Sequence, residues 1–244
     1  MTTITISNTL FEIELVRIPA GEFLMGSDPA KDNDAQPREQ PQHRVYVAEF
    51  YIGKYPVTNE QYAVFVLATN HRMPYFIFAN WEEGKMPAGK ENHPVAGISW
   101  DDAMAFCDWL SQTTGQVYRL PTEAEWEKAA RGTDGQIYPW GNEWDASRLN
   151  SADAGPGETT PVGHYSPEPS GDSFYGVADM AGNVWEWCAD WYNDSKTDRA
   201  LRGGAFYNEA SWVRCAARDR NVPYGRNRYY GLRVVGGGPF LSEL

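Results

Sequence analysis

The sequence predicts an α+β fold in one domain, residues 1–244, and three observations lead to this prediction. The first 50 residues alternate apolar and polar side chains, as strands do. Three helix starts carry capping boxes. After Gly132, segments rich in Gly, Pro, Asp and Ser replace the regular patterns. Neither an internal repeat nor a linker interrupts the chain, so a single domain is the simplest interpretation.

Two stretches near the N-terminus have the alternation that is typical of strands. They are ELVRIPAGEFLMGS, residues 14–27, and HRVYVAEFYIGKY, residues 43–55. The segment between them, residues 28–42, is polar and contains proline, so we expect a surface loop there.

Three helices follow, each announced by a Ser or Thr that precedes a Gln, Asp or Glu by three residues. The pairs are Thr58 with Gln61, Ser99 with Asp102, and Thr122 with Glu125. Apolar residues at helical spacing follow each pair, and Gly115 and Gly132 end the second and third helices. The long loops beyond Gly132 are expected to be functional or held in place by something, because loops of that length are uncommon in compact domains.

Charge and hydropathy exclude several classes of partner. A net charge of −12 and a pI near 4.8 argue against nucleic acid and anionic lipid, and they are compatible with a bound cation. No stretch approaches the roughly 20 apolar residues of a membrane span, so we expect no membrane insertion. The N-terminus has no export signal, which makes a cytoplasmic protein the expectation and leaves surface display by another route open.

The cysteines and histidines form no familiar catalytic or metal-binding pattern. Cys107, Cys188 and Cys215 are too few and too far apart for a disulfide scaffold or a zinc knuckle. No two of the four histidines stand four residues apart, and neither a phosphate loop nor a nucleophile elbow is present.

Seven motifs occur in order along nearly the whole chain. They are FLMGS, YPVTNEQY, HPVAGISWDDAMAFCDWL, YRLPTEAEWEKAARG, YPWGNEW, DMAGNVWEWCADWY and LRGGAF…RCAAR…GLRVV. Together they resemble the formylglycine-generating enzyme/sulfatase-modifying-factor family, and RLPTEAEWEKAARG and GNVWEW are the most specific of them. The resemblance implies a C-type-lectin-like fold with few helices, a small twisted antiparallel sheet and long ordered loops.

The family's oxidase chemistry does not carry over residue by residue. Formylglycine-generating enzymes bind copper through two C-terminal cysteines; the resemblance places Asn208 at the first and a shortened stretch, EASWV, at the second. Asn cannot replace a thiolate, because Cu(I) prefers soft sulfur ligands. The iron-dependent branch draws its histidines mainly from an extra helical domain, which these residues do not contain. We therefore expect no enzyme, no copper and no iron, while a disulfide between Cys107 and Cys215 is implied by the resemblance and depends on the compartment.

The C-terminal frame of RGG, RCAAR, proline and GLRVV is also similar to that of variable proteins of diversity-generating retroelements. In those systems mutated adenines turn Asn codons into codons for Tyr, Ser, Asp, Gly or Arg. The resemblance implies a variable region at residues 202–235 that binds a protein or other macromolecular ligand. The predicted ligand-binding residues are Tyr207, Asn208, Ser211, Trp212, Asp219, Asn221, Tyr224, Gly225, Asn227, Arg228, Tyr229 and Tyr230.

Composition and stability support the same division of this segment. Tyr, Trp and Arg without Lys are typical of recognition surfaces. Ten changes in a core would exceed a stability of about 5–15 kcal/mol, so variable residues must face solvent while a frame carries the packing. The predicted frame is Arg202, Gly203, Gly204, Val213, Cys215, Ala216, Ala217, Leu232 and Val234. We expect Arg214, Arg218 and Arg233 to be structural ion-pair partners, leave Phe206 open between core and surface, and expect Tyr224, Tyr229 and Tyr230 to be exposed.

Calcium is the expected structural cofactor, and the resemblance implies two sites for it. The first would use the carboxylates of Asp179 and Glu186 with the carbonyls of Gly182 and Val184. The second would use Asn150, Ser151 and Asp153. The alternative for each acid is a solvated or hydrogen-bonded loop carboxylate.

Three functions remain open on the sequence alone. The first is a non-catalytic protein with a diversified recognition surface. The second is an oxidoreductase of the formylglycine-generating or sulfoxide-synthase type, and the third is an accessory module of the same fold without diversification.

Overall fold

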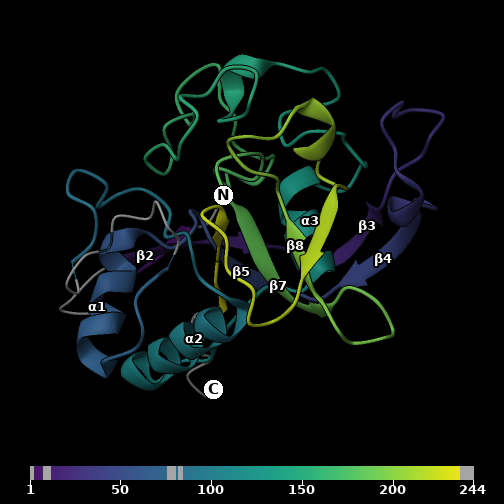
Figure 1. Ribbon diagram of the computed structural model, residues 1–244. Helices are drawn as coiled ribbons and strands as arrows, with labels where there is room; N and C mark the ends of the chain where they lie inside the picture. Colours follow the sequence, from purple (N-terminus) through teal and green to yellow (C-terminus); the bar gives the residue numbers. More distant parts are fainter. Residues whose placement is uncertain (1–2, 8–11, 76–80, 82–84, 237–244) are drawn as a thin grey trace.

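The computed structural model describes residues 3–7, 12–75, 81 and 85–236. Its three α-helices are α1 (Asn59–Thr69), α2 (Trp100–Thr114) and α3 (Glu123–Arg131). Long loops, drawn in teal and green in Figure 1, make up most of the chain between α3 and strand β7 (Trp185–Trp191). None of the described helices has both the length and the apolar character that a membrane crossing requires.

The first sheet joins the two ends of the described chain. Its strand order is β1 (Thr3–Ser7), β2 (Glu12–Ile18), β5 (Phe50–Gly53), β11 (Val235–Gly236) and β6 (Tyr118–Arg119), and all its pairs are antiparallel. Strand β11 therefore lies between strands from the N-terminal half. A separate hairpin pairs β3 (Gly21–Met25) with β4 (His43–Val47).

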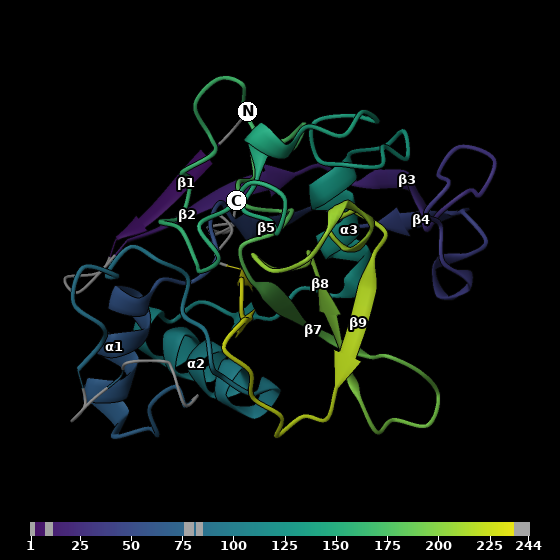
Figure 2. The ribbon, with the colours of Figure 1, turned by 45° about the horizontal axis from the view of Figure 1, so that its top comes forward.

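The second sheet is built largely from the C-terminal part of the chain. Its order is β10 (Tyr230–Gly231), β7 (Trp185–Trp191), β8 (Arg199–Arg202) and β9 (Arg218–Asn221). Strand β10 runs parallel to β7, and the other pairs are antiparallel. Figure 2 shows β7, β8 and β9 side by side, and α3 contacts both β7 and β8.

All three predicted helix starts are confirmed. In each capping box the Ser or Thr side chain accepts a hydrogen bond from the backbone N–H three residues on, and the side chain of that residue accepts one from the backbone N–H of the Ser or Thr. These bonds satisfy donors that a helix start leaves free. Gly115 ends α2 in the left-handed conformation and Gly132 ends α3, as predicted.

The core consists of two large buried clusters, and the cysteines are divided between them. Cys107 lies in the cluster that includes Phe106 on α2, whereas Cys188 and Cys215 lie in the cluster around Trp126 on α3. All three are free thiols. The structure therefore does not form the disulfide between Cys107 and Cys215 that the resemblance implied.

The loop at residues 28–42 corrects a prediction, because two of its acids are buried. Asp32 and Glu39 face Arg214, whose side chain is 1% exposed. Nη1 of Arg214 lies 2.7 Å from Asp32 Oδ2 and 2.8 Å from Glu39 Oε2, and Nη2 lies 3.0 Å from Glu39 Oε1. A buried guanidinium requires opposite charge, so the polar loop turns inward at these two positions.

The other expected ion-pair arginines of the C-terminal segment are paired in the same way. Arg218 donates to both oxygens of Glu123, and Arg233 binds Glu186 through Nη2 at 2.8 Å and Nε at 3.0 Å. Each acid comes from an element outside residues 202–235, so these contacts fix the segment onto the rest of the fold.

Replacing Arg214 by Met should lower the free energy of unfolding by about 3–5 kcal/mol, because Asp32 and Glu39 would stay buried without their partner. Denaturant titration followed by circular dichroism measures the change. Arg17→Met is the control, since Arg17 and its partner Glu49 are both exposed and the pair contributes little. Equal midpoints for Arg214→Met and the wild type would contradict the structural role.

Candidate recognition surface

The predicted frame of the C-terminal segment is buried throughout. The two glycines are buried, and every other frame residue is at most 2% exposed. The frame residues are Arg202, Gly203, Gly204, Val213, Cys215, Ala216, Ala217, Leu232 and Val234. Gly204 has φ +74°, and a Cβ there would lie 2.6 Å from Val213 Cγ1. The second glycine of the RGG motif is therefore required by both its backbone conformation and its packing.

The predicted ligand-binding residues differ in exposure. Tyr207, Tyr224 and Arg228 are exposed, with Tyr224 at 72%. The partly buried members are Asn208, Ser211, Trp212, Asp219, Asn221, Gly225, Asn227 and Tyr229. Phe206, which the sequence left open, is buried.

Tyr230 was predicted to be exposed, and this prediction is wrong. The side chain is 4% exposed and packs edge-to-face on Trp187, with ring centroids 5.2 Å apart. Its hydroxyl accepts a hydrogen bond from Asn221 Nδ2 at 2.9 Å. The pairing of β10 with β7 places Tyr230 in the core, and the ring of the partly buried Tyr229 packs edge-to-face on it, with centroids 5.2 Å apart.

Gly225 also belongs to the frame rather than to the variable positions. A Cβ at this residue would lie 2.7 Å from Asn221 Oδ1 and 3.0 Å from the Val222 carbonyl oxygen. Asn221 in turn is held by its bond to Tyr230 and accepts one from the Val222 N–H. Asn221, Gly225 and Tyr230 thus form one packed unit that cannot vary freely.

The centre of the surface is a group of aromatic rings around Asn208. The rings of Tyr207 and Tyr229 lie 4.4 Å apart. Asn208 Oδ1 accepts hydrogen bonds from Trp185 Nε1 at 3.0 Å and from the Ala205 N–H at 2.9 Å. Burial, followed by the hydrogen bond with Tyr229, raises the pKa of Tyr207. The Asn208 side-chain oxygen is therefore used to hold Trp185 and the local backbone in place, rather than being free to bind a ligand.

Two arginines that sequence reasoning did not select support the edges of this surface. The guanidinium of Arg38, from the loop at residues 28–42, lies 4.6 Å from the centre of the Trp212 ring. Arg226 Nη2 lies 2.7 Å from Asp102, in the first turn of α2. The acids Asp32 and Glu39 of the same loop are the sequence signal that this loop contacts the C-terminal segment. That signal can be interpreted only when Arg214 is known to be their buried partner.

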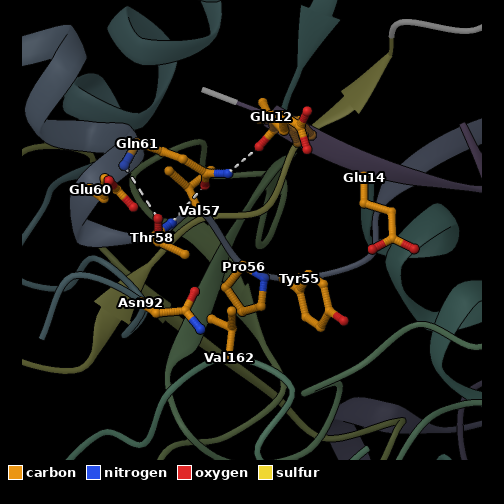
Figure 3. Close-up of a pocket in the computed structure, with 12 residues that line it drawn as sticks. Glu12, Glu14, Tyr55, Pro56, Val57, Thr58, Glu60, Gln61, Asn92 and Val162 are labelled. Atoms are coloured by element: carbon orange, nitrogen blue, oxygen red, sulfur yellow. Dashed lines mark hydrogen bonds between the residues drawn. The ribbon is translucent and has the colours of Figure 1, made fainter. Parts of the chain in front are cut away.

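Two hollows flank the C-terminal segment. The larger, about 450 Å³, lies at the start of α1 and has acidic walls at Glu12, Glu14 and Glu60. Figure 3 shows Gln61 closing one side of it, where its Nε2 donates to the Glu12 carbonyl oxygen at 2.7 Å. Val234, a buried frame residue, is the one described residue of the C-terminal segment that lines it, so this hollow is separate from the recognition surface. The smaller hollow, about 310 Å³, lies beside Phe206 and Arg228.

All three thiols of the chain are buried. Burial raises the pKa of Cys107 and of Cys188, and it raises the pKa of Cys215 to about 12. All three are therefore protonated at neutral pH, whereas the thiolate is the nucleophile and the metal ligand. Within the described residues, no three His, Cys, Asp or Glu side chains gather closely enough to hold a metal ion.

In the first expected calcium site, the two carboxylates already accept hydrogen bonds from protein donors. Glu186 accepts hydrogen bonds from Arg233 on both oxygens and from Trp126 Nε1 at 2.7 Å. Asp179 accepts one from the Gly163 N–H at 2.7 Å, and burial raises its pKa to about 6. The carboxylate of Glu186 is thus neutralised by an arginine, and the Glu186 side chain does not fit a cation.

In the second expected calcium site, the side-chain oxygen of Asn150 could bind a cation. Asn150 Oδ1 is buried and accepts no hydrogen bond from any described residue, while its Nδ2 donates to the Glu158 carbonyl oxygen at 2.8 Å. Ser151 is buried next to it, whereas Asp153 is exposed. An unpaired buried amide oxygen is costly, and a hard cation is one group that would satisfy it.

Comparison with known proteins gives a consistent picture of the fold. The family model for "Sulfatase-modifying factor enzyme 1-like domain" matches residues 7–237. The formylglycine-generating enzyme of Thermomonospora curvata is 32% identical over 294 residues, which cover 91% of this chain and 92% of that enzyme. The serine/threonine-protein kinase pkn1 of Chlamydia caviae is 34% identical over 92% of this chain, but the match spans only 38% of the kinase.

Two solved structures share the architecture. PvdO from Pseudomonas aeruginosa is 28% identical with a TM-score of 0.79, over 92% of this chain and 94% of that one. Treponema denticola variable protein 1 is 22% identical with a TM-score of 0.76, over 96% and 99%. These matches confirm the predicted α+β, C-type-lectin-like fold of the formylglycine-generating-enzyme type.

The folded protein should react with none of its three thiols when it is treated with Ellman's reagent at pH 8, because every thiol is buried and its pKa lies well above 8. The same reagent should titrate all three after unfolding in guanidinium. Rapid reaction of one thiol equivalent in the folded chain would contradict this prediction, and a thiol-dependent activity would again have to be considered.

Proposed function

We propose that this chain, which belongs to the sulfatase-modifying factor enzyme 1-like family, is a non-catalytic binding protein whose recognition surface is displayed by residues 202–235. The observation that carries the proposal is the division of that segment. Its frame is buried, while Tyr207, Tyr224 and Arg228 project into solvent between frame residues. Such a surface can change without loss of the fold, as a variable protein of a diversity-generating retroelement requires.

The residues that would make this chain an oxidase point the other way. Asn208 stands where the resemblance implies a copper-binding thiolate, and its side chain already accepts two hydrogen bonds. The remaining thiols are buried and protonated. The 32% identity to a formylglycine-generating enzyme favours the oxidase as the second candidate. Copper binding with oxygen consumption on a thiol peptide would establish it.

The partner that best suits the surface is a protein. Tyr, Trp and Arg dominate the energetic centres of protein interfaces, and the aromatic group of Tyr207, Tyr229 and Trp212 is flanked by arginines. Tyr and Trp contribute large contact areas at little cost in rotamer freedom. A standard interface uses about 20–30 residues per side, so neighbouring loops such as the one that carries Arg38 would supply the rest.

Calcium remains the cofactor that we propose, at the second of the expected sites. Asn150 would supply its free Oδ1, and backbone oxygens of the same loop would complete the shell. When bound, the ion would fix the loop at residues 150–160 against Asn183, which already donates its backbone N–H to the Asn150 carbonyl oxygen at 2.9 Å.

Simultaneous randomisation of surface positions should leave the protein folded, whereas the same treatment of frame positions should unfold it. The surface library varies the exposed Tyr207, Tyr224 and Arg228 and the partly buried Ser211 and Asn227. The matched frame library varies Val213, Asn221, Gly225, Tyr230 and Leu232. Five frame changes at about 1 kcal/mol or more each approach the total stability, while surface changes stay within about 0.5 kcal/mol. Protease resistance of displayed clones measures the folded fraction.

Equal survival of the two libraries would refute the division between frame and variable positions. The encoding DNA tests diversification itself: a near-duplicate of the C-terminal coding segment should lie beside a reverse-transcriptase gene and differ at template adenines. Intact frame packing in a gene that lacks both features would indicate an accessory module of the same fold.

Calcium should raise the thermal midpoint of the wild-type protein relative to EDTA. An excess of a hundredfold over the dissociation constant corresponds to about 2.7 kcal/mol. Asn150→Ala should abolish this shift, because it removes the free Oδ1; Asn193→Ala, at an exposed loop position, should keep it. Each variant is compared with itself, so a change in its basal stability does not matter. An undiminished shift in Asn150→Ala would place the ion elsewhere.

A further inference from the structure

We propose that the 310 Å³ hollow beside Arg228 is an anchoring pocket for a carboxylate of the ligand, with Arg228 as the residue that selects it. The inference rests on the proposed binding function and deepens it by naming the chemistry that one part of the surface recognises. The volume lies at the lower end of the range for ligand pockets, about 300–1,000 Å³. It therefore suits one side chain or the end of a chain.

Most of the pocket wall comes from outside the C-terminal segment. The segment contributes Phe206 and Arg228. The other lining residues are Asn59, Trp81, Pro87, Lys90, Pro94, Ala96, Gly157, Glu158 and Thr159. Of all these residues, only position 228 is among the predicted variable sites. The pocket thus has a constant wall and one changeable side chain.

The constant wall is held in place by hydrogen bonds between separate elements. Asn59 Nδ2 donates to the Lys90 carbonyl oxygen at 2.9 Å, and the Asn59 N–H donates to the His93 carbonyl oxygen. His93 Nδ1 lies 3.0 Å from Thr159 Oγ1, and this contact joins the two loops, residues 87–96 and 157–159, that line the hollow. These contacts keep the hollow preformed, so a ligand group would bind without ordering the loops first.

Charge in the pocket favours an anion. Lys90 Nζ lies 2.6 Å from Glu158 Oε2, so these two charges neutralise each other. Arg228 pairs with no carboxylate among the residues that the structure describes. The guanidinium is therefore the one unbalanced charge among the described lining residues, on a protein whose net charge of −12 otherwise repels acidic groups.

The placement of Arg228 suits a carboxylate that is carried by an apolar group. The guanidinium lies 5.4 Å from the centre of the buried Phe206 ring, within the range of a cation–π contact. The planar guanidinium offers two parallel N–H groups, which match the two oxygens of a carboxylate. Trp81 and the two prolines provide an apolar wall for the group that carries the carboxylate.

The pocket can be tested with small probes and the full chain, without any partner protein. N-acetylphenylalanine represents a chain terminus, N-acetylglutamate α-amide represents an acidic side chain, and N-acetylphenylalaninamide is the neutral control. Saturation-transfer NMR gives the affinity of each. We expect at least one carboxylate to bind, and the neutral amide to bind about tenfold more weakly. The stronger carboxylate identifies the source of the ligand group.

Two matched variants assign the effect to Arg228. Arg228→Asn should weaken the binding of the carboxylate probe about tenfold. Arg220→Asn removes the same charge from β9, outside the hollow, and should leave binding unchanged. Both side chains are exposed, so both variants should fold, which the thermal midpoint verifies.

Three results would overturn the inference: no binding of either carboxylate, equal binding of the neutral amide, or equal affinities in Arg228→Asn and the wild type. None of them touches the proposed display function, which the two libraries and the encoding DNA test separately. Conversely, a chain without diversification would still hold this pocket, so failure of one proposal is distinguishable from failure of the other.

Discussion

The rest of the structure depends on buried ion pairs between arginines of the C-terminal segment and acids from distant parts of the chain. Arg202 binds Glu127 on α3, Arg214 binds Glu39, and Arg233 binds Glu186 on β7. Buried pairs of this kind contribute little net stability compared with apolar packing, but breaking one leaves an uncompensated charge. These pairs therefore mainly fix the position of the segment against α3, β7 and the loop at residues 28–42, and they do not involve its exposed side chains.

This constraint explains how a recognition surface can coexist with a strict fold. The positions that face solvent lie between buried runs of frame residues, and a change at such a position costs little because little packing is lost. The structure also narrows the set of changeable positions. Tyr230 packs on Trp187, and Gly225 has no space for a Cβ beside Asn221. In return, the surface gains fixed neighbours, namely Arg38 over Trp212 and the preformed pocket beside Arg228.

Local features of the sequence predicted the fold well, and features that depend on distant partners escaped it. The capping boxes at Thr58, Ser99 and Thr122 involve residues three apart, so the sequence alone defines them. Burial of Glu39 could not be predicted in this way, because its partner Arg214 is 175 residues away. The orientation of Tyr230 depends on the register of a two-residue strand with β7, and alternation by itself allows either Tyr229 or Tyr230 to point inward.

Asn208 is the residue at which the proposed binding function and the alternative oxidase differ most. Its Oδ1 satisfies two donors at the base of the aromatic group, the Trp185 indole and the Ala205 backbone N–H. A thiolate at this position would have to accept both bonds with a larger, softer atom, and a thiol would leave at least one buried donor poorly satisfied. The amide therefore stabilises the ring arrangement that a ligand would meet, and it removes the group that copper would need. In the binding function proposed for this chain, the hydrogen bonds of Asn208 would thus serve the recognition surface.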